Sequence, residues 1–209
     1  MNNETQQRRE YRTTNSWGSR DSFLEKGFAL TSTTEIAKVA GCNQALVHYY
    51  FRTKDQLFDA IFERKVYLFM SAFLEIDSEE LSFEERLKRK VEAHYDILSA
   101  NPKLPFLFVN ELTTNPERIK TVREKIDATS QSFFFRFKTE LEEEIQKGTI
   151  RPMNPIDLLL TILALNATLF IVSPMIKVIA NVSDDDFHQL IAHRKQENVK
   201  IILNSLKPW

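Results

Sequence analysis

The chain has 209 residues, which is enough for one substantial core or two small domains. Its 43% hydrophobic and 27% charged residues are ordinary for a soluble globular protein, and only 4 Gly argue against a turn-rich all-β fold. The net charge is −1, and a single cysteine, Cys42, excludes an internal disulfide and a zinc site built on several cysteines. The polar start MNNETQQRRE has no apolar run of the signal-peptide type, so we expect a cytoplasmic protein.

Charge is unevenly distributed along the chain. Residues 1–54 hold eight Lys or Arg against five Asp or Glu, an excess of three positive charges, which leaves −4 for residues 55–209. A mildly basic N-terminal third suits contact with phosphate. An excess of this size also arises by chance clustering, so it does not by itself indicate a nucleic-acid partner.

Residues 33–54, TTEIAKVAGCNQALVHYYFRTK, have the pattern of two short helices joined by a tight turn. Thr33 or Thr34 can cap the first helix with its hydroxyl, Gly41 can end that helix, and Asn43 can cap the second. The apolar residues expected to face a small core are Ile36, Ala37, Ala40, Val47 and Tyr50 or Phe51. Such a pair forms a helix-turn-helix unit, whose second helix enters the major groove of DNA.

The motifs IAKVAG, HYYF and K-D-x-L-F, which run from Ile36 to Phe58, resemble the DNA-binding domain of TetR-type (tetracycline-repressor-like) transcriptional regulators. Beyond them the chain resembles the family in length and helical character, with a G-x-I-R-P turn from Gly148 to Pro152. The resemblance implies an all-α fold. Residues 1–54 would form an N-terminal three-helix helix-turn-helix DNA-binding domain, and residues 55–209 a larger helical domain for effector binding and dimerisation.

The first helix departs from the family's pattern. The family opens with I-L-x-A-A-x-x-L-F, and Phe23 to Phe28 match the end of this helix, but Asn15, Ser16, Gly18 and Ser19 occupy apolar and alanine positions. A local slip of the reading frame over residues 12–19 would restore E-Q-R-I-L-G-A-A. The alternative is an authentic divergent N-terminus, and the intact mass together with resequencing of the gene distinguishes the two.

The remainder of the chain has the 3.6-residue apolar period of helices. We expect helices over 55–77, over 82–99 with a capping box of Ser82 and Glu85, and over 104–112. Further helices are expected over 116–147, ended by Gly148, over 155–180, and over 184–206, capped by Ser183.

The segment from Leu158 to Ile176 has no charged residue over 19 positions, long enough to span a bilayer. Asn166 and two threonines, Pro174, and flanks without a Lys/Arg bias argue against a membrane helix. A helix that is apolar on most sides is otherwise buried between a core and a partner subunit. We therefore expect no membrane association and a homodimer formed through residues 155–206, which is where the family resemblance also places the dimer interface.

The second helix of the pair carries the expected contacts with double-stranded DNA at a near-palindromic operator. Gln44 can read adenine, Ala45 and Leu46 can pack on a thymine methyl, and His48 should lie on the same side, although it can instead be a packing histidine. Tyr49 and Lys54 suit phosphate. The resemblance also implies phosphate contacts at Thr33 and Asn43, two positions that capping alone would explain.

The 16 Phe residues raise the possibility of a ligand cavity between the central helices, an idea that comes from the family resemblance. Such pockets are mostly apolar with a few polar groups, although aromatic residues at helical spacing are more often plain core. The candidate lining residues are His94, Tyr95, Phe106, Asn110, Phe133, Phe137, Asn166 and Phe170, with Phe108 and Phe134 as further aromatic candidates. The expected ligand is a small apolar effector.

Three interpretations remain open. The first is a ligand-responsive transcriptional regulator, a repressor released from its operator by the effector. The second is an all-α enzyme or small-molecule carrier with no DNA role. The chain has no clustered His, Gly-rich phosphate loop, nucleophile motif or CxxC, so we expect no catalytic residues, no metal and no cofactor. The third is DNA binding without an effector.

Overall fold

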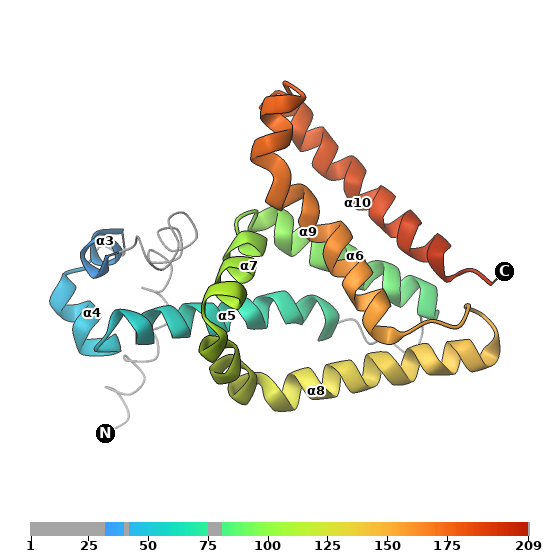
Figure 1. Cartoon of the computed structure of the whole chain (residues 1–209), viewed down its shortest axis with the longest axis horizontal. Coiled ribbons are helices and arrows are strands. Elements are labelled where there is room, and N and C mark those ends of the chain that lie inside the picture. Colours follow the sequence, from blue (N-terminus) through green and yellow to red (C-terminus); the bar gives the residue numbers. More distant parts are fainter. Residues whose placement is uncertain (1–31, 40–41, 75–80, 209) are drawn as a thin grey trace. The chain divides into compact units, whose positions relative to one another are not determined.

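The computed structural model describes residues 32–39, 42–74 and 81–208, and the chain divides into two compact units, 1–66 and 67–209 (Figure 1). The described residues form helices and no strand, so the predicted all-α fold is confirmed. The predicted first helix, its departure at residues 15–19, and Gly41 lie outside the described residues. The functional boundary after residue 54 stays a prediction.

The smaller unit contains α3 (Thr33–Val39), α4 (Gln44–Phe51) and the first part of α5 (Lys54–Leu74). Its core is formed by one face of each helix, as the apolar pattern predicts. Tyr50 is half-buried, and the buried residues are Ile36, Ala37, Val47, Phe51, Leu57, Phe58, Ile61 and Phe62.

The cap of α3 differs from the prediction. The helix begins at Thr33, and the preceding Ser32 accepts a hydrogen bond from the backbone N–H of Glu35 at 3.1 Å. The Glu35 carboxylate in turn accepts from the backbone N–H of Ser32 at 3.1 Å, which completes a capping box. Ser32 therefore caps the helix, and the hydroxyls of Thr33 and Thr34 make other contacts.

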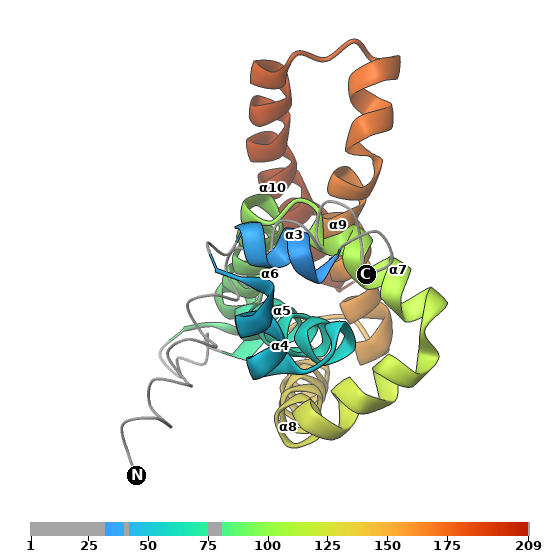
Figure 2. The same cartoon turned by 90° about the vertical axis from the view of Figure 1, so that its left-hand side faces the viewer.

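In the part of the larger unit that the structure describes, the end of α5 is followed by five further helices. These are α6 (Phe83–Ala100), α7 (Leu104–Thr114), α8 (Pro116–Lys147), α9 (Pro155–Ile179) and α10 (Asp184–Leu206). Helices α6, α9 and α10 pack on one another, and α7 contacts both α8 and α9. Figures 1 and 2 show α9 and α10 as an antiparallel pair joined by a short turn.

Predicted helix ends of the larger unit are confirmed where local signals set them. Ser82 accepts from Glu85 N–H at 3.2 Å, Ser183 accepts from Asp186 N–H at 3.1 Å, and Gly148 ends α8 with a φ of 72°. The carboxylate of Glu85 does not complete the predicted capping box, because it pairs with Arg89 at 3.1 Å and Lys88 at 3.5 Å.

The core of the larger unit is a cluster contributed by α6, α8, α9, α10 and Ile150 of the segment between α8 and α9. Its aromatic part comprises Phe83, Phe133 and Phe137, and the last two rings stack with centroids 5.9 Å apart. The aliphatic members are Leu87, Val91, Leu141, Ile150, Leu158, Ile162, Val199, Ile202 and Leu206. The long uncharged segment of α9 contributes Leu158 and Ile162, which are fully buried.

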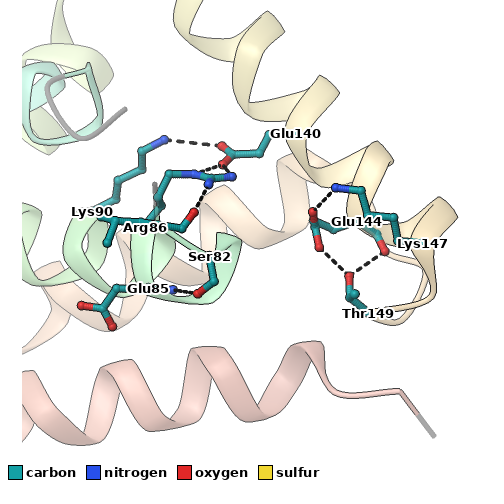
Figure 3. A network of polar contacts seen from close by, with 9 residues as sticks. Ser82, Glu85, Arg86, Lys90, Glu140, Glu144, Lys147 and Thr149 are labelled. Carbon is teal, nitrogen blue, oxygen red and sulfur yellow. Dashed lines mark hydrogen bonds and ion pairs between the residues drawn. The ribbon is translucent and has the colours of Figure 1, made fainter. Parts of the chain in front are cut away.

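A polar network joins α6 to α8 beside this core. Figure 3 shows Arg86 and Lys90 of α6 directed at Glu140 of α8. The Arg86 Nε donates to Glu140 at 2.6 Å, and the ammonium of Lys90 lies 3.5 Å from the same carboxylate. Lys90 is almost fully buried, so this carboxylate supplies a counter-charge that water cannot replace.

Candidate functional site

Helix α4 presents one exposed face, as expected for a helix that reads DNA. Gln44, Ala45, His48 and Tyr49 are exposed, and 62% of Tyr49 is accessible. Leu46 is half-buried at the edge of this face. Because the opposite face packs in the small core through Val47 and Phe51, the predicted base-reading side chains share the free side.

Gln44 is hydrogen-bonded to α3 through both polar atoms of its amide. Its Nε2 donates to the Thr33 hydroxyl at 3.1 Å, and its Oε1 accepts from the Thr34 hydroxyl at 3.2 Å. The same Nε2 lies 3.4 Å from Nε2 of His48. The other ring nitrogen of His48, Nδ1, lies 3.1 Å from the carbonyl of Arg52. A carbonyl only accepts, so the neutral tautomer with the proton on Nδ1 satisfies both contacts.

The remaining predicted DNA contacts lie at helix starts. Asn43 caps α4, because its Oδ1 accepts from the backbone N–H of Leu46 at 2.8 Å. Lys54 is the first residue of α5, and the preceding Thr53 accepts from the backbone N–H of Gln56 at 3.2 Å. The capping role predicted for Asn43 is confirmed, and its phosphate contact stays a prediction.

A network of hydrogen bonds between buried side-chain amides connects α6, α9 and α10 in the larger unit. Asn166 of α9 donates to the carbonyl of Val91 at 2.9 Å and lies 3.0 Å from Nδ1 of His94. Its Oδ1 accepts from Asn198 of α10 at 3.0 Å, and Arg194 donates to Asn198 at 2.6 Å. Every hydrogen-bonding group of the Asn166 amide is thus engaged within the protein, so the pocket prediction draws no support from this residue.

Burial shifts the pKa values of His94 and Tyr95, which lie beside these buried amides. The pKa of His94 falls to about 4 because the fully buried site disfavours its charged form. Burial likewise raises the pKa of Tyr95 to about 12, and its hydroxyl donates to the carbonyl of Ile191 at 2.9 Å. Both side chains are therefore neutral at physiological pH.

The structure brings together only part of the predicted pocket. The ring of Tyr95 lies 5.4 Å from that of Phe170, near the His94–Asn166 pair. Phe133 and Phe137 belong to the apolar cluster, and Phe106 is 60% exposed on α7. Asn110 is half-buried, with its Nδ2 3.5 Å from Glu111. That these eight residues line one cavity stays a prediction.

Sequence reasoning missed Asn198 and Arg194, which extend the buried amide chain. The signal was present, since Asn198 falls in the same helical register as the buried Phe187, Ile202 and Leu206. It also missed the ring of Phe69, which meets His94 edge-on at 4.6 Å and Phe108 at 5.1 Å.

Helix α9 also carries an apolar stripe on its outer side. Its exposed members recur at helical spacing and include Ile156, Leu160, Ile171, Met175, Val178 and Ile179. Val178 and Ile179 are the most exposed, at 81% and 76%. Isolated exposed apolar residues are ordinary, but a stripe along a whole helix indicates an interaction surface.

Comparison with known proteins agrees with this geometry. Residues 18–61 match the family model described as bacterial regulatory proteins, tetR family. The chain carries a tetR-family DNA-binding domain. The prediction made from Ile36 to Phe58 is therefore confirmed. The match begins at residue 18, within the segment that departs from the family's pattern.

The individual relatives are described as regulators and are similar to this chain at low identity. The chain is 23% identical over 134 residues to an uncharacterized HTH-type transcriptional regulator, YhgD, of Bacillus subtilis, covering 64% of this chain and 69% of that protein. It is 24% identical over 129 residues to a fatty acid metabolism regulator protein of the same organism, covering 62% of this chain and 65% of that protein.

A solved structure extends the likeness to nearly the whole fold. A bacterial regulatory protein in the tetR family from Rhodococcus RHA1 superposes with a TM-score of 0.70 at 19% identity, covering 95% of this chain and 98% of that one. The matched family and these relatives are described as regulators, which agrees with the prediction that the chain is not an enzyme.

By length and composition alone, α9 would pass as a membrane helix, with mean hydropathy 2.1 in its most apolar stretch. Core helices of soluble proteins pass the same test, so this is weak evidence. The buried side of α9 packs on α6 and α10, and the polar Asn166 joins all three helices. Among the described residues, no group of three or more His, Cys, Asp or Glu forms a candidate metal site.

Proposed function

We propose that this protein is a ligand-responsive repressor that acts in the bacterial cytoplasm and leaves its operator when a small apolar effector binds. The observation that carries the proposal is the exposed face of α4 on a tetR-family domain. Its first residue is Gln44, a residue type that forms paired hydrogen bonds with adenine. The separate larger unit supplies far more helix than DNA reading requires.

Selection of duplexes from a random-sequence pool, followed by footprinting, tests DNA binding directly. The expected product is a near-palindromic site with half-sites one helical turn apart, about 34–36 Å. Transcription from a promoter carrying that site should fall when the protein is supplied. A rise would make the protein an activator, and an unenriched pool would remove the DNA role.

Two substitutions separate the roles of the proposed contacts. Lys54→Ala should weaken binding to all sequences alike and lessen its salt dependence, because a phosphate contact releases counterions without reading bases. Gln44→Ala should instead relax the preference at one position per half-site, by about 1–3 kcal/mol. Titrations at several salt concentrations, on the selected site and on single-base variants of it, measure both effects. If Lys54→Ala alters base preference and Gln44→Ala does not, the roles are reversed.

The protein acts in this proposal as a homodimer through residues 155–206. The apolar stripe on α9 supports this, because it leaves large side chains such as Leu160, Met175 and Val178 exposed on a single protomer. A dimer also explains how one short helix per protomer reads a palindromic site.

The proposed effector is a molecule with a long acyl chain that binds in the larger unit between about residues 90 and 170, in a largely apolar pocket. One relative is named a fatty acid metabolism regulator, and the aromatic-rich helices suit an acyl chain. An effector shifts the DNA-bound state only by its difference in affinity between two states, so it and the operator should exclude each other.

Fluorescence anisotropy on the selected duplex tests the effector. Palmitate is expected to release the protein from DNA, and octanoate serves as the short-chain control, because binding should strengthen with each buried methylene. Equal DNA affinity with and without either fatty acid would remove the long-chain fatty acid from the proposal.

A further inference from the structure

The amide of Gln44 is occupied in the DNA-free protein by a donor–acceptor pair that resembles its proposed target. Adenine presents an N–H donor and a ring-nitrogen acceptor to the two polar atoms of a glutamine amide. Here the Thr34 hydroxyl donates to Oε1 at 3.2 Å and the Thr33 hydroxyl accepts from Nε2 at 3.1 Å. The amide cannot make these two hydrogen bonds to the threonine hydroxyls and the equivalent pair to adenine at the same time.

The hydroxyl of Thr34 has one hydrogen, and Gln44 takes it. Thr34 is exposed on the first turn of α3, so an incoming phosphate oxygen can compete with Oε1 of Gln44 for this hydrogen. A phosphate oxygen at neutral pH accepts and does not donate, so a phosphate that takes this hydrogen leaves Oε1 of Gln44 without that donor. Contact with the DNA backbone would then free Oε1 of the amide to accept from an N–H donor of a base.

We propose that Thr34 is a positioning residue that couples phosphate contact to base reading. Together the hydroxyls of Thr33 and Thr34 form a latch on the Gln44 amide, and DNA phosphate releases its Oε1 side by taking the Thr34 hydrogen. His48 remains a hydrogen-bond acceptor for Nε2 of Gln44. Its proton is on Nδ1, directed at the Arg52 carbonyl, which leaves its own Nε2 free of a proton. This inference rests on the proposed DNA-binding function and names a residue outside the predicted contacts.

A double-mutant cycle tests the latch on the duplex selected by the wild-type protein. With Gln44 present, Thr34→Val removes both the latch and a phosphate contact, and these have opposite effects on affinity. In the Gln44→Ala background it removes the phosphate contact alone. The loss of affinity caused by Thr34→Val should therefore be about two- to tenfold larger in the Gln44→Ala background than in the wild type, the range for one hydrogen bond.

A matched cycle controls for the general loss of a phosphate donor. Tyr49→Phe removes another hydroxyl proposed to contact phosphate, and its loss of affinity should be the same with and without Gln44. Thr34→Ser keeps the hydroxyl and should behave as the wild type. Equal losses for Thr34→Val in both backgrounds would overturn the latch.

NMR spectra of the DNA-free protein give an independent test of the latch. The side-chain amide signals of Gln44, assigned by their disappearance in Gln44→Ala, should shift in Thr34→Val and stay in place in Thr34→Ser. Unmoved signals in Thr34→Val would contradict the latch even if DNA binding is intact. If the wild-type protein selects no sequence, the proposed function fails with this inference, whereas specific binding with an unmoved amide defeats the latch alone.

Discussion

At the scale of single residues, His94 illustrates how burial selects one protonation state. Its ring is fully buried, Nδ1 faces an amide of Asn166, and the edge of Phe69 lies against it. None of these neighbours offers a negative charge to an imidazolium. The neutral ring is therefore part of the folded core, and it is held in one orientation by its partners.

This environment predicts that acid destabilises the protein through His94. Its pKa falls from 6.5 to about 4 on folding, so between these values the unfolded chain binds the extra proton. The free energy of unfolding should therefore fall as the pH is lowered through this window, by up to about 3 kcal/mol. Urea denaturation at a series of pH values measures this dependence.

Two variants isolate that contribution. His94→Gln should flatten the dependence between pH 6.5 and 4, whatever its effect on stability at neutral pH. His193→Gln, at an exposed histidine of α10, is the comparison for losing a histidine from the surface. An unchanged slope in His94→Gln would show that other groups cause the acid sensitivity.

At the scale of helices, the predictable features are those encoded within a few neighbouring residues. Ser82, Ser183 and Gly148 mark helix ends through contacts spanning at most five positions, and the sequence located them. The cap of α3 was misassigned because Ser32 stands directly before two threonines of the same chemistry. The Arg86–Glu140 pair joins residues 54 positions apart, and no local pattern specifies such a partner.

The end of α8 gives a prediction about backbone alone. Gly148 has a φ of 72°, and a Cβ added there would meet no atom within 4 Å. Gly148→Ala should therefore destabilise the protein only through its left-handed backbone, by about 1–2 kcal/mol. Gly148→Asn should cost less, because asparagine tolerates this conformation better. Thermal denaturation of both variants checks the order, and equal losses would indicate a steric cause.

One carboxylate, that of Glu140, pairs with both cations of the polar network between α6 and α8. Glu140→Gln leaves the buried Lys90 and the half-buried Arg86 without their shared negative charge, and should cost about 2–3 kcal/mol. Glu142→Gln, on the same helix, removes a more exposed partner that lies 3.7 Å from Lys138, and should cost less than about 1 kcal/mol. Chemical denaturation gives both values. Similar losses for the two variants would mean that burial does not strengthen the Glu140 pairs.

At the scale of the whole molecule, the sequence was sufficient for the class of fold and for the helix-turn-helix pair, but not for the interior of the larger unit. The motif from Ile36 to Phe58 is compact, and its periodicity places Gln44 and His48 on the free side of α4. The eight pocket candidates have in common only their residue types, aromatic or polar. Whether such residues meet depends on how α6, α7, α8 and α9 pack, and this brought His94 to Asn166 and left Phe106 exposed.

The proposed dimer gives the last prediction. Leu160 is 57% exposed on the apolar stripe of α9, so a charge placed there disturbs no core but would be buried in a dimer interface. Leu160→Glu should therefore yield a monomer in light scattering at micromolar concentration, with unchanged helical content. Affinity for the selected palindrome should fall on the order of 100-fold, because two linked half-sites become separate binding events.

Phe135→Glu is the matched control, since Phe135 is 70% exposed on α8, away from the stripe, and receives the same charge. This variant should remain a dimer and keep its affinity for the palindrome. The contrast is decisive because both substitutions exchange an exposed apolar side chain for a carboxylate and differ only in the surface that they occupy. A dimeric Leu160→Glu protein, or a wild-type protein that is itself monomeric, would remove the α9 stripe from the proposed interface.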